Sequence, residues 1–462
     1  MEDQPQIRTG AVGFRPDLTR LATSLPTYQD RFGWGQKQRD VVKRVTLGEY
    51  RPADDRGDPI ARLLEKDKGR MPELLPIKYG RMAASPFGFF RGAVVLMAYD
   101  LAHLPATQLQ VRICGDAHAR NMGAFAAPDG HLVFDLNDFD EAYPGPWEWD
   151  LKRMATSILL AGREAGDRDD LCSDAVHQLV RSYRDALERF SHLKLRELIR
   201  FEIRRSSREA GPIASVLEKA ERADIMHVLK KLTVPQGEFR RFVDKPPLLH
   251  HVEDRVVERV LASLPDYRET LGPDRKQVLD AYTPFDVTFK VVGTGSVGTQ
   301  DYVVLLFGTG ADDPLFLQIK EARTSPYQPY VKDVPPFPHE GRRVAEAQYR
   351  LQTVTDPFLG WTTIDGVHFI GRQLADHKAA IEIAELKGGA LIDYASVAGE
   401  ILAKGHARTG DAAALFGYCG DSDKLDKAIA QFAYAYASQT EKDHDLLLEA
   451  IRKGKVRAEN PQ

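Results

Sequence analysis

The chain contains little cysteine, and its cysteines do not cluster. Three cysteines, Cys114, Cys172 and Cys419, stand far apart among 462 residues. This spacing suits neither a disulfide framework nor a zinc site, and it is typical of proteins from a reducing compartment. We therefore expect a fold that does not depend on disulfides.

The chain also lacks a strong net charge, a leader and a membrane-spanning run. Its formal net charge of −4 gives no overall attraction to nucleic acid or to an anionic membrane. No basic stripe interleaved with aromatic residues points to nucleic acid. The first residues lack the basic and apolar regions of a secretory signal, and the longest apolar stretch, at 92–104, is too short to span a bilayer. We expect a cytoplasmic protein with neither a nucleic-acid nor a membrane partner.

What the sequence does contain predicts an α+β protein of several packed units. The apolar fraction of 43% and the charged fraction of 28% are ordinary for a globular protein. We expect an N-terminal extension at 1–75, a large helical lobe at 76–270 and a sheet lobe at 271–375. Residues 376–462 should form C-terminal helices that pack on the helical lobe.

A glycine-rich segment begins at Gly293 and has the pattern G-x-G-x-x-G, completed by Gly295 and Gly298. The pattern alone is weak, because dinucleotide-binding folds and kinases share it. Here the residues that follow, 302–307, are β-branched, aromatic and aliphatic, so they predict a strand rather than a helix. A strand, a glycine loop and a second strand together are typical of the loop that covers ATP phosphates in kinases. Ser296 lies inside this loop and is a further candidate contact; an unliganded hairpin is the alternative.

A lysine ends the next predicted strand. Residues 315–319 are mainly apolar and lead to Lys320, a pattern typical of the kinase lysine that binds the α- and β-phosphates. A helix predicted at 341–353 carries Glu346, which could orient the lysine through an ion pair. Glu340 and Glu321 are alternative partners for the lysine.

A second group of candidate residues lies earlier, at 114–121. Asp116 is followed five residues later by Asn121, which is the spacing of a kinase catalytic loop. There the aspartate accepts the proton of the attacking hydroxyl, and the asparagine amide oxygen binds Mg²⁺. Magnesium prefers hard oxygen ligands, so one carboxylate and one amide suffice beside phosphates. We expect His118 to be structural, because a lone histidine is poor evidence for a metal.

Several acids follow the predicted strand at 131–134. Asp135 emerges directly from the apolar run, and Asp138 comes three residues later. Because so many carboxylates would repel one another without a cation, we expect Asp135 and Asp138 to bind metal. Asp140 and Glu141 also suit a solvated acidic turn.

Three segments resemble the aminoglycoside phosphotransferase and choline kinase-like branch of the kinase superfamily. They lie at 115–121, 133–135 and 146–151, and the corresponding family patterns are H-G-D-x-H-x-x-N, I-D-W and G-D-P-x-x-D-L-A. The resemblance implies that Asp116 is the catalytic aspartate and that Asn121 and Asp135 bind metal. It also implies that Asp150 braces the loop. Cys114 stands where that branch has histidine.

From about residue 40 onward, the chain is also similar to an uncharacterised bacterial family catalogued as domain of unknown function 2252. The segments that carry this resemblance are 85–92, 134–141, 144–150, 293–298, 320–322, 356–361 and 406–411. It implies kinase-like membership but no established substrate.

The two groups of candidate residues occur in the reverse of the kinase order. The catalytic and metal-binding residues come first, and the glycine loop follows. We therefore expect a circularly permuted, protein-kinase-like two-lobe fold, which is feasible where the termini lie close together on the surface. The cut should fall after a hinge at 371–374, where Gln373 is a candidate nucleotide contact.

The function that these residues predict is an ATP- and Mg²⁺-dependent phosphotransferase acting on a hydroxyl of a small molecule or protein. A kinase-like AMP transferase, a non-catalytic ATP sensor and an unrelated metal-dependent hydrolase are alternatives. Arg91, on the apolar helix before the catalytic segment, either braces an acid, contacts phosphate or lies at the surface.

Overall fold

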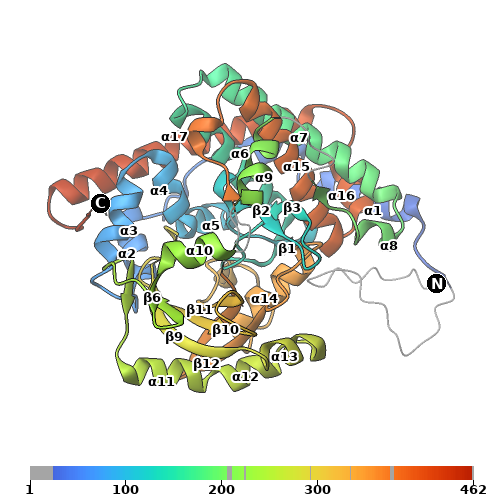
Figure 1. Ribbon diagram of the computed structural model, residues 1–462. Helices are drawn as coiled ribbons and strands as arrows, with labels where there is room; N and C mark the ends of the chain where they lie inside the picture. The colour runs from blue at the N-terminus through green and yellow to red at the C-terminus, as the bar shows by residue number, and fades with distance from the viewer. Residues whose placement is uncertain are drawn as a thin grey trace.

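The structure is a computed structural model that describes residues 24–204, 211–222, 225–291, 293–332, 334–374 and 379–459. It is an α+β fold in which a six-stranded antiparallel sheet lies below a large group of helices (Figure 1). The first 23 residues of the expected N-terminal extension lie outside the described residues. None of the helices in the described ranges is long and apolar enough to cross a bilayer.

The sheet has the strand order β12-β13-β11-β10-β9-β8. Its strands are β8 (Leu249–His251), β9 (Thr283–Lys290), β10 (Asp301–Phe307), β11 (Pro314–Glu321), β12 (Gly360–Ile364) and β13 (Val367–Gln373). The three central strands form a meander, and the glycine loop joins β9 to β10, as the sequence predicted. Helix α14 (Glu340–Leu351) follows β11 and packs on β12 and β13.

The two faces of the sheet have different covers. One face carries Val304, Leu306 and Leu317 and packs against α11 (Asp254–Ala262) and α12 (Leu264–Glu269). The other face carries Val303, Leu305 and Phe316 and packs against α10 (Ile225–Leu232) and the hairpin of β6 (Thr233–Gln236) and β7 (Phe239–Phe242). The side chains alternate between the two faces because successive residues of a strand point in opposite directions.

The boundary expected at residue 270 lies earlier in the structure. Strand β8 pairs with β9, and the apolar side of α11, which includes Val256 and Val260, packs under the sheet. The segment from about 225 to 279 therefore belongs with the sheet rather than with the helices that precede it. The sequence patterns of a short edge strand such as β8 and an amphipathic helix such as α11 do not indicate which part of the fold these elements pack against.

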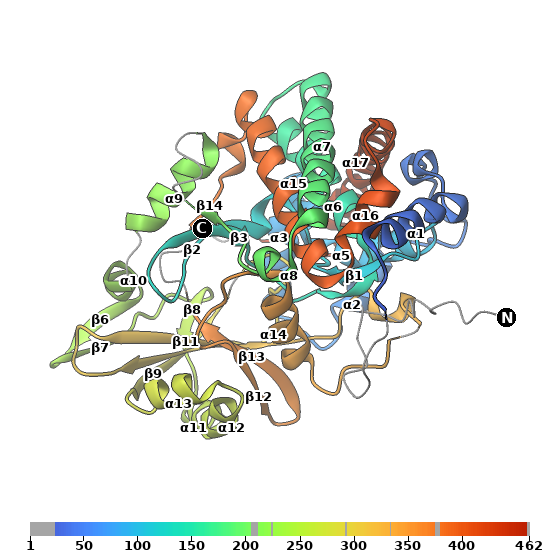
Figure 2. The same cartoon turned by 90° about the vertical axis from the view of Figure 1, so that its right-hand side faces the viewer.

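The helical part is built from segments far apart in sequence. Helix α15 packs along α7, and α17 packs along α6 (Figure 2). The helices concerned are α6 (Trp147–Glu164), α7 (Asp169–His192), α15 (Gly389–Thr409), α16 (Ala412–Cys419) and α17 (Lys424–Arg452). Their shared core includes Trp147, Tyr183 and Phe432, all buried. The C-terminal helices thus complete the core of the helical part.

The N-terminal region is more strongly packed than its polar composition indicated. Helix α1 (Tyr28–Val41) lies against α16, where Arg39 donates to the carbonyl oxygens of Gly417 and Tyr418. Leu47 and Leu63 are buried in two different cores. The other elements of this region are η1 (Arg44–Gly48), α2 (Pro59–Lys66) and α3 (Leu75–Ala83).

The apolar segment before the loop at 114–121 forms two helices rather than one. Helix α4 (Pro86–Gly92) and helix α5 (Val94–Ala102) are separated by the single residue Ala93, which caps both. The Ser85 hydroxyl caps α4 by accepting from the amide of Gly88 at 3.0 Å. Arg91 consequently lies in the last turn of a short helix.

Two small antiparallel groups of strands carry the loop at 114–121 and the acidic segment that follows it. Strand β1 (Gln110–Ile113) pairs with β4 (Tyr143–Pro146), and β2 (Met122–Ala126) pairs with β3 (Leu132–Leu136). Strand β14 (Ala379–Ala380), which follows the sheet in sequence, pairs with β2. The remaining elements are η2 (Ala119–Asn121), α8 (Leu195–Leu198), β5 (Ile203–Arg204), α9 (Pro212–Arg222), α13 (Pro273–Leu279), η4 (Gln328–Tyr330) and η5 (Ile383–Glu385).

Candidate functional site

The early and late groups of candidate residues meet around one small cavity of about 50 Å³. Lys320 on β11 forms an ion pair with Asp140, 180 positions earlier in the chain. The cavity is lined by Arg91, Asp116, His118, Asn121, Asp138, Asp140, Glu141, Gly293, Thr294, Gly295 and Ser296. The structure therefore brings the glycine loop (293–298) to the loop at 114–121 and to the acidic segment (135–141).

The loop at 114–121 is held by the buried carboxylate of Asp150 on α6. This carboxylate accepts from the backbone amides of Cys114 at 2.6 Å and Gly115 at 2.9 Å. Gly115 has a φ of 81°, and a side chain there would collide with the carbonyl of Glu141. His406 of α15 lies 3.4 Å from the same carboxylate. Asp150 thus fixes the start of the loop, in the bracing position that the resemblance implied.

Cys114 joins this loop to the acidic segment. Its thiol donates to the carbonyl oxygen of Asp138 at 3.3 Å. Burial raises the pKa of the Cys114 thiol well above its ordinary value, so the proton needed for this bond stays in place. A thiol therefore makes the link between the two segments at the position where the resembling kinases have histidine.

Asp116 faces the cavity and has an arginine partner from α6. The Arg153 Nε atom donates to Asp116 Oδ1 at 2.7 Å, and Arg153 itself is fully buried. The Asp116 side chain is 17% exposed, on the cavity side. Burial raises the pKa of Asp116 to about 6, against the opposing charge of Arg153. A carboxylate with that pKa is ionised at neutral pH and has a higher proton affinity than a solvated one.

His118 is a buried structural residue rather than a metal ligand in this arrangement. Its Nδ1 atom accepts from the amide of Arg120 at 3.2 Å, which leaves the proton on Nε2, 3.6 Å from Asp116 Oδ2. Burial and the neighbouring charges of Arg91 and Arg153 hold the pKa of His118 well below its ordinary value. The imidazole is therefore neutral and orients the short helix η2.

Asn121 and Asp138 both line the cavity, as two of the three predicted metal ligands. The Asn121 Nδ2 atom donates to the carbonyl of Asp116 at 2.7 Å, which leaves its amide oxygen as the group that a cation would use. Within the described ranges, no three His, Cys, Asp or Glu side chains gather to hold a metal by themselves. A magnesium ion here would need phosphate or water oxygens as well.

The structure does not place Asp135, the third predicted ligand, at the cavity. Its carboxylate accepts from the amide of Leu136 at 2.8 Å and forms a buried ion pair with Lys404 of α15. Sequence spacing could not indicate this partner, because Lys404 lies 269 positions away. Of the two predicted acidic ligands, Asp138 therefore lines the cavity and Asp135 does not.

The glycine loop leaves several backbone donors without protein partners. Gly293 and Gly298 have φ values of 63° and 87°, which favour glycine. Among the described residues, the amides of Thr294, Gly295 and Ser296 donate to no protein acceptor, and these residues line the cavity. Such a group of free amides is suited to an anion.

Lys320 has Asp140 as its partner rather than Glu346. Burial alone would lower the pKa of Lys320, but the charge of Asp140 outweighs it and raises that pKa. Asp140 also accepts from the Ser296 hydroxyl at 3.2 Å, so it is not a solvated turn residue. Glu346 instead pairs with Arg342 on the exposed side of α14, at 2.7 Å.

The alternative partners of Lys320 and the candidate Gln373 also have other contacts. Glu340 accepts from Arg343 at 2.5 Å, and Glu321 accepts from the amide of Gln300 at 2.9 Å. Gln373 ends β13, where its backbone N–H donates to the Asp356 carboxylate at 2.6 Å. It does not line the cavity.

Helix α14 reaches the site through Arg343, a residue that the sequence analysis did not identify. The guanidinium is fully buried and donates to the carbonyl oxygens of Ala142 at 2.5 Å and of Asp140 and Arg323 at 2.8 Å. It therefore fixes the backbone of the acidic segment relative to β11. Helical periodicity places residue 343 on the buried side with Val344 and Ala347, a signal that could have drawn attention to it.

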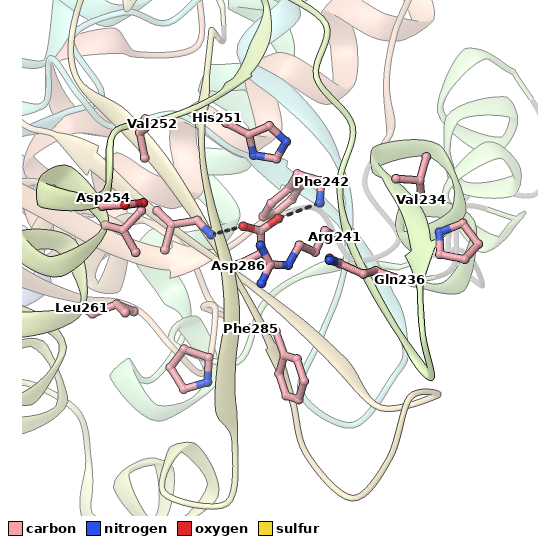
Figure 3. Close-up of a pocket in the computed structure, with 14 residues that line it drawn as sticks. Val234, Gln236, Arg241, Phe242, His251, Val252, Asp254, Leu261, Phe285 and Asp286 are labelled. Carbon is pink, nitrogen blue, oxygen red and sulfur yellow. Dashed lines mark hydrogen bonds between the residues drawn. The ribbon is translucent and has the colours of Figure 1, made fainter.

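A larger cavity, of about 650 Å³, lies elsewhere and contains none of the predicted site residues (Figure 3). It is formed by the hairpin β6–β7, by β8, by the start of β9 and by α11. Its Asp286 carboxylate accepts from the amides of Phe242 at 2.8 Å and Val287 at 3.0 Å. Because that carboxylate is used to hold the hairpin, we place the chemistry at the smaller cavity.

The fold and the site define an α+β protein whose glycine loop meets an aspartate-bearing loop at a small cavity, with a buried lysine paired to an acid of the cavity wall. The chain belongs to a family described as an uncharacterized protein conserved in bacteria (DUF2252), whose family model matches residues 70–450. The match includes every candidate residue named above. Neither the curated proteins nor the solved structures contain a match to this chain.

Proposed function

We propose that this protein is a kinase-like phosphotransferase that uses ATP and Mg²⁺ and acts on a hydroxyl of a small molecule or protein. The observation that carries the proposal is the contact between Lys320 and Asp140, next to the free amides of the glycine loop and across the cavity from Asp116. These are the groups that phosphoryl transfer requires: phosphate donors, a cation site and a base for the acceptor.

The residues present fit a magnesium-bound triphosphate. The free amides at 294–296 and the ammonium of Lys320 are suited to phosphate oxygens. Asp138 and the amide oxygen of Asn121 supply two hard oxygen ligands for the cation. When bound, the magnesium ion would neutralise charge on the phosphates.

In the proposed reaction, the oxygen of the acceptor hydroxyl forms a bond to the γ-phosphorus. The bond between that phosphorus and the bridging oxygen breaks, and ADP leaves. Asp116 takes the hydroxyl proton, and Arg153 keeps the carboxylate oriented and ionised beforehand. The neutral His118 beside Asp116 does not compete for that proton, because burial disfavours its charged form.

The size of the cavity implies that the glycine loop moves. A volume of about 50 Å³ accommodates about one or two water molecules, far less than a triphosphate. The hydrogen bond from Ser296 to Asp140 at 3.2 Å is the contact that has to break for entry. Since Asp140 also holds Lys320, phosphates entering here would compete for the lysine directly.

The order of the elements supports a circularly permuted, two-lobe kinase-like arrangement. The glycine loop lies between the first and second strands of a meander, and Lys320 lies on the third, followed by helix α14. Kinases have the same succession, but before the catalytic segment. Here the chain returns from β13 to β14, which pairs with β2 beside that segment.

ATP turnover measured against a panel of metabolites and proteins tests the proposal, with Asp116→Ala as the variant. We expect turnover in the wild type and a large loss in the variant, because Asp116 is the group proposed to take the hydroxyl proton. A mass shift of one AMP on an acceptor would indicate nucleotidyl transfer instead. Tight ATP binding without any product would indicate a sensor.

A further inference from the structure

Arg91 is a cation on the wall of the cavity, next to the residues of the proposed reaction. It lies in the last turn of α4 and lines the cavity together with Asp116 and His118. Its carbonyl oxygen is 3.8 Å from the position that a Cβ atom on Gly295 would take. The side chain therefore starts where the tip of the glycine loop meets the loop at 114–121.

Two of the carboxylates that line the cavity with Arg91 already have cationic partners. Asp116 is paired with Arg153, and Asp140 is paired with Lys320. Among the described residues, the guanidinium of Arg91 forms no hydrogen bond or ion pair, and its Nε atom is buried without a partner. Arg91 as a whole is half-buried, but a buried donor such as its Nε atom is ordinarily paired, because leaving it unsatisfied costs free energy.

The charge of Arg91 is maintained despite this environment. Burial, together with the nearby charges of Arg120 and Arg81, lowers the pKa of Arg91 to about 10. The side chain is therefore still cationic at neutral pH. Burial and the neighbouring cations thus disfavour its charged form without neutralising it.

We propose that Arg91 binds an anionic oxygen group, of the phosphate or carboxylate class, between the tip of the glycine loop and Asp116. The planar guanidinium presents parallel donors that match such a group. This inference rests on the proposed function, under which the anionic group comes from one of two sources. It is the γ-phosphate of the nucleotide, or it is an anionic substituent near the reacting hydroxyl of the acceptor.

Calorimetric titrations of the full chain distinguish these sources. Wild type, Arg91→Gln and Arg91→Lys are titrated with Mg²⁺-AMP-PNP, with Mg²⁺-ADP and with inorganic phosphate, the last both alone and after saturation with Mg²⁺-AMP-PNP. Arg168→Gln is the matched control, since Arg168 is an exposed arginine paired with Asp170 at 2.7 Å. It should bind every probe as the wild type does.

If Arg91 holds the γ-phosphate, Arg91→Gln should weaken AMP-PNP binding by about tenfold or more and leave ADP binding unchanged. If it holds an acceptor group, both nucleotides should bind normally. Phosphate binding to the AMP-PNP complex should then be lost in Arg91→Gln and weakened in Arg91→Lys. Equal binding of every probe by Arg91→Gln and wild type would overturn the proposal.

The test also separates this proposal from the proposed function. Phosphate binding that requires Arg91, in a protein that binds neither nucleotide, would support the anion site and reject the ATP-dependent function. Should Arg91→Gln fail to fold, tungstate soaked into wild-type crystals provides the second measurement. Anomalous density at the Arg91 guanidinium supports the proposal, and density only at other arginines contradicts it.

Discussion

At the scale of single residues, three aspartates of one acidic segment differ because each meets a different partner. Asp135 is buried against Lys404, Asp140 pairs with Lys320, and Asp138 faces the cavity. Spacing alone indicated that metal-binding acids lie in this segment. It could not assign them, because the lysines that neutralise two of them come from β11 and α15.

This difference predicts that two isosteric substitutions affect different properties, one the binding of nucleotide and the other the stability of the fold. Asp138→Asn should weaken Mg²⁺-dependent binding of AMP-PNP by about tenfold or more, because a charged ligand of a divalent cation is lost, with little effect on stability. Asp135→Asn should instead lower the free energy of unfolding by roughly 3–5 kcal/mol, because Lys404 stays buried without its counter-charge.

Nucleotide titrations with and without Mg²⁺, together with urea unfolding of both variants, measure these effects. The assignment is wrong if Asp135→Asn loses magnesium dependence while Asp138→Asn keeps it. Normal behaviour of Asp138→Asn in both assays would remove that residue from the cation site.

The 114–121 loop was the part of the site that the sequence described best. Asp116 and Asn121 both line the cavity, and Asp150 braces the loop as the resemblance implied. Arg153, the cationic partner of Asp116, was not foreseen, although it lies one helical turn after Asp150 on a largely buried helix. An arginine in such a position requires an acid, and only the folded chain identifies Asp116 as that acid.

At the scale of elements, helix α14 acts on the site through an arginine and backbone carbonyls. Arg343 fixes the carbonyls of Asp140 and Ala142, and Asp140 in turn holds Lys320. Glu346, the residue expected to reach the lysine, forms its ion pair on the exposed side of the helix. The helix therefore positions the lysine indirectly.

Arg343→Lys should disturb that coupling, because one ammonium cannot reach three carbonyl acceptors at once. We expect binding of Mg²⁺-AMP-PNP to weaken by about tenfold, and the free energy of unfolding to fall by roughly 1–3 kcal/mol for the unsatisfied carbonyls. Arg342→Lys, one residue away and exposed, is the control and should change neither quantity. Indistinguishable nucleotide affinities for the two variants would refute the role of Arg343.

Most long elements were predictable, and short ones were not. The strand after the glycine loop, helix α14 and the C-terminal helices α15 and α17 lie in the segments where such elements were expected. The segment at 233–242 forms a hairpin inside the region expected to be a helical lobe. Packing on Phe285 and Phe307 of the sheet stabilises that hairpin, and no local pattern predicts such contacts.

At the scale of the whole molecule, the two ends of the chain are interlocked. Arg56, in the N-terminal region, donates to Asp100 of α5 at 2.8 Å and to Asp443 of α17 at 2.6 Å. Tyr436 adds a further bond to Asp100 at 2.8 Å. The region expected to be an extension is thus part of the core, since it neutralises two buried acids.

Replacing Arg56 should therefore destabilise the whole fold. We expect Arg56→Met to lower the free energy of unfolding by roughly 3–5 kcal/mol, because Asp100 and Asp443 would face each other without a cation. The exposed Arg168→Met should change it by less than about 0.5 kcal/mol. Urea unfolding monitored by circular dichroism measures both, and equal stabilities would show that the N-terminal region is dispensable.

The central claim is that the loop at 114–121 and the glycine loop at 293–298, which lie far apart in the sequence, close over one nucleotide. A crystal structure of the wild type with Mg²⁺-AMP-PNP tests it most directly. The account predicts phosphates between the glycine loop and Asp138, with Lys320 bonded to a phosphate oxygen and Asn121 on the metal. Nucleotide bound instead in the larger cavity beside the hairpin β6–β7, with Lys320 still on Asp140, would contradict it.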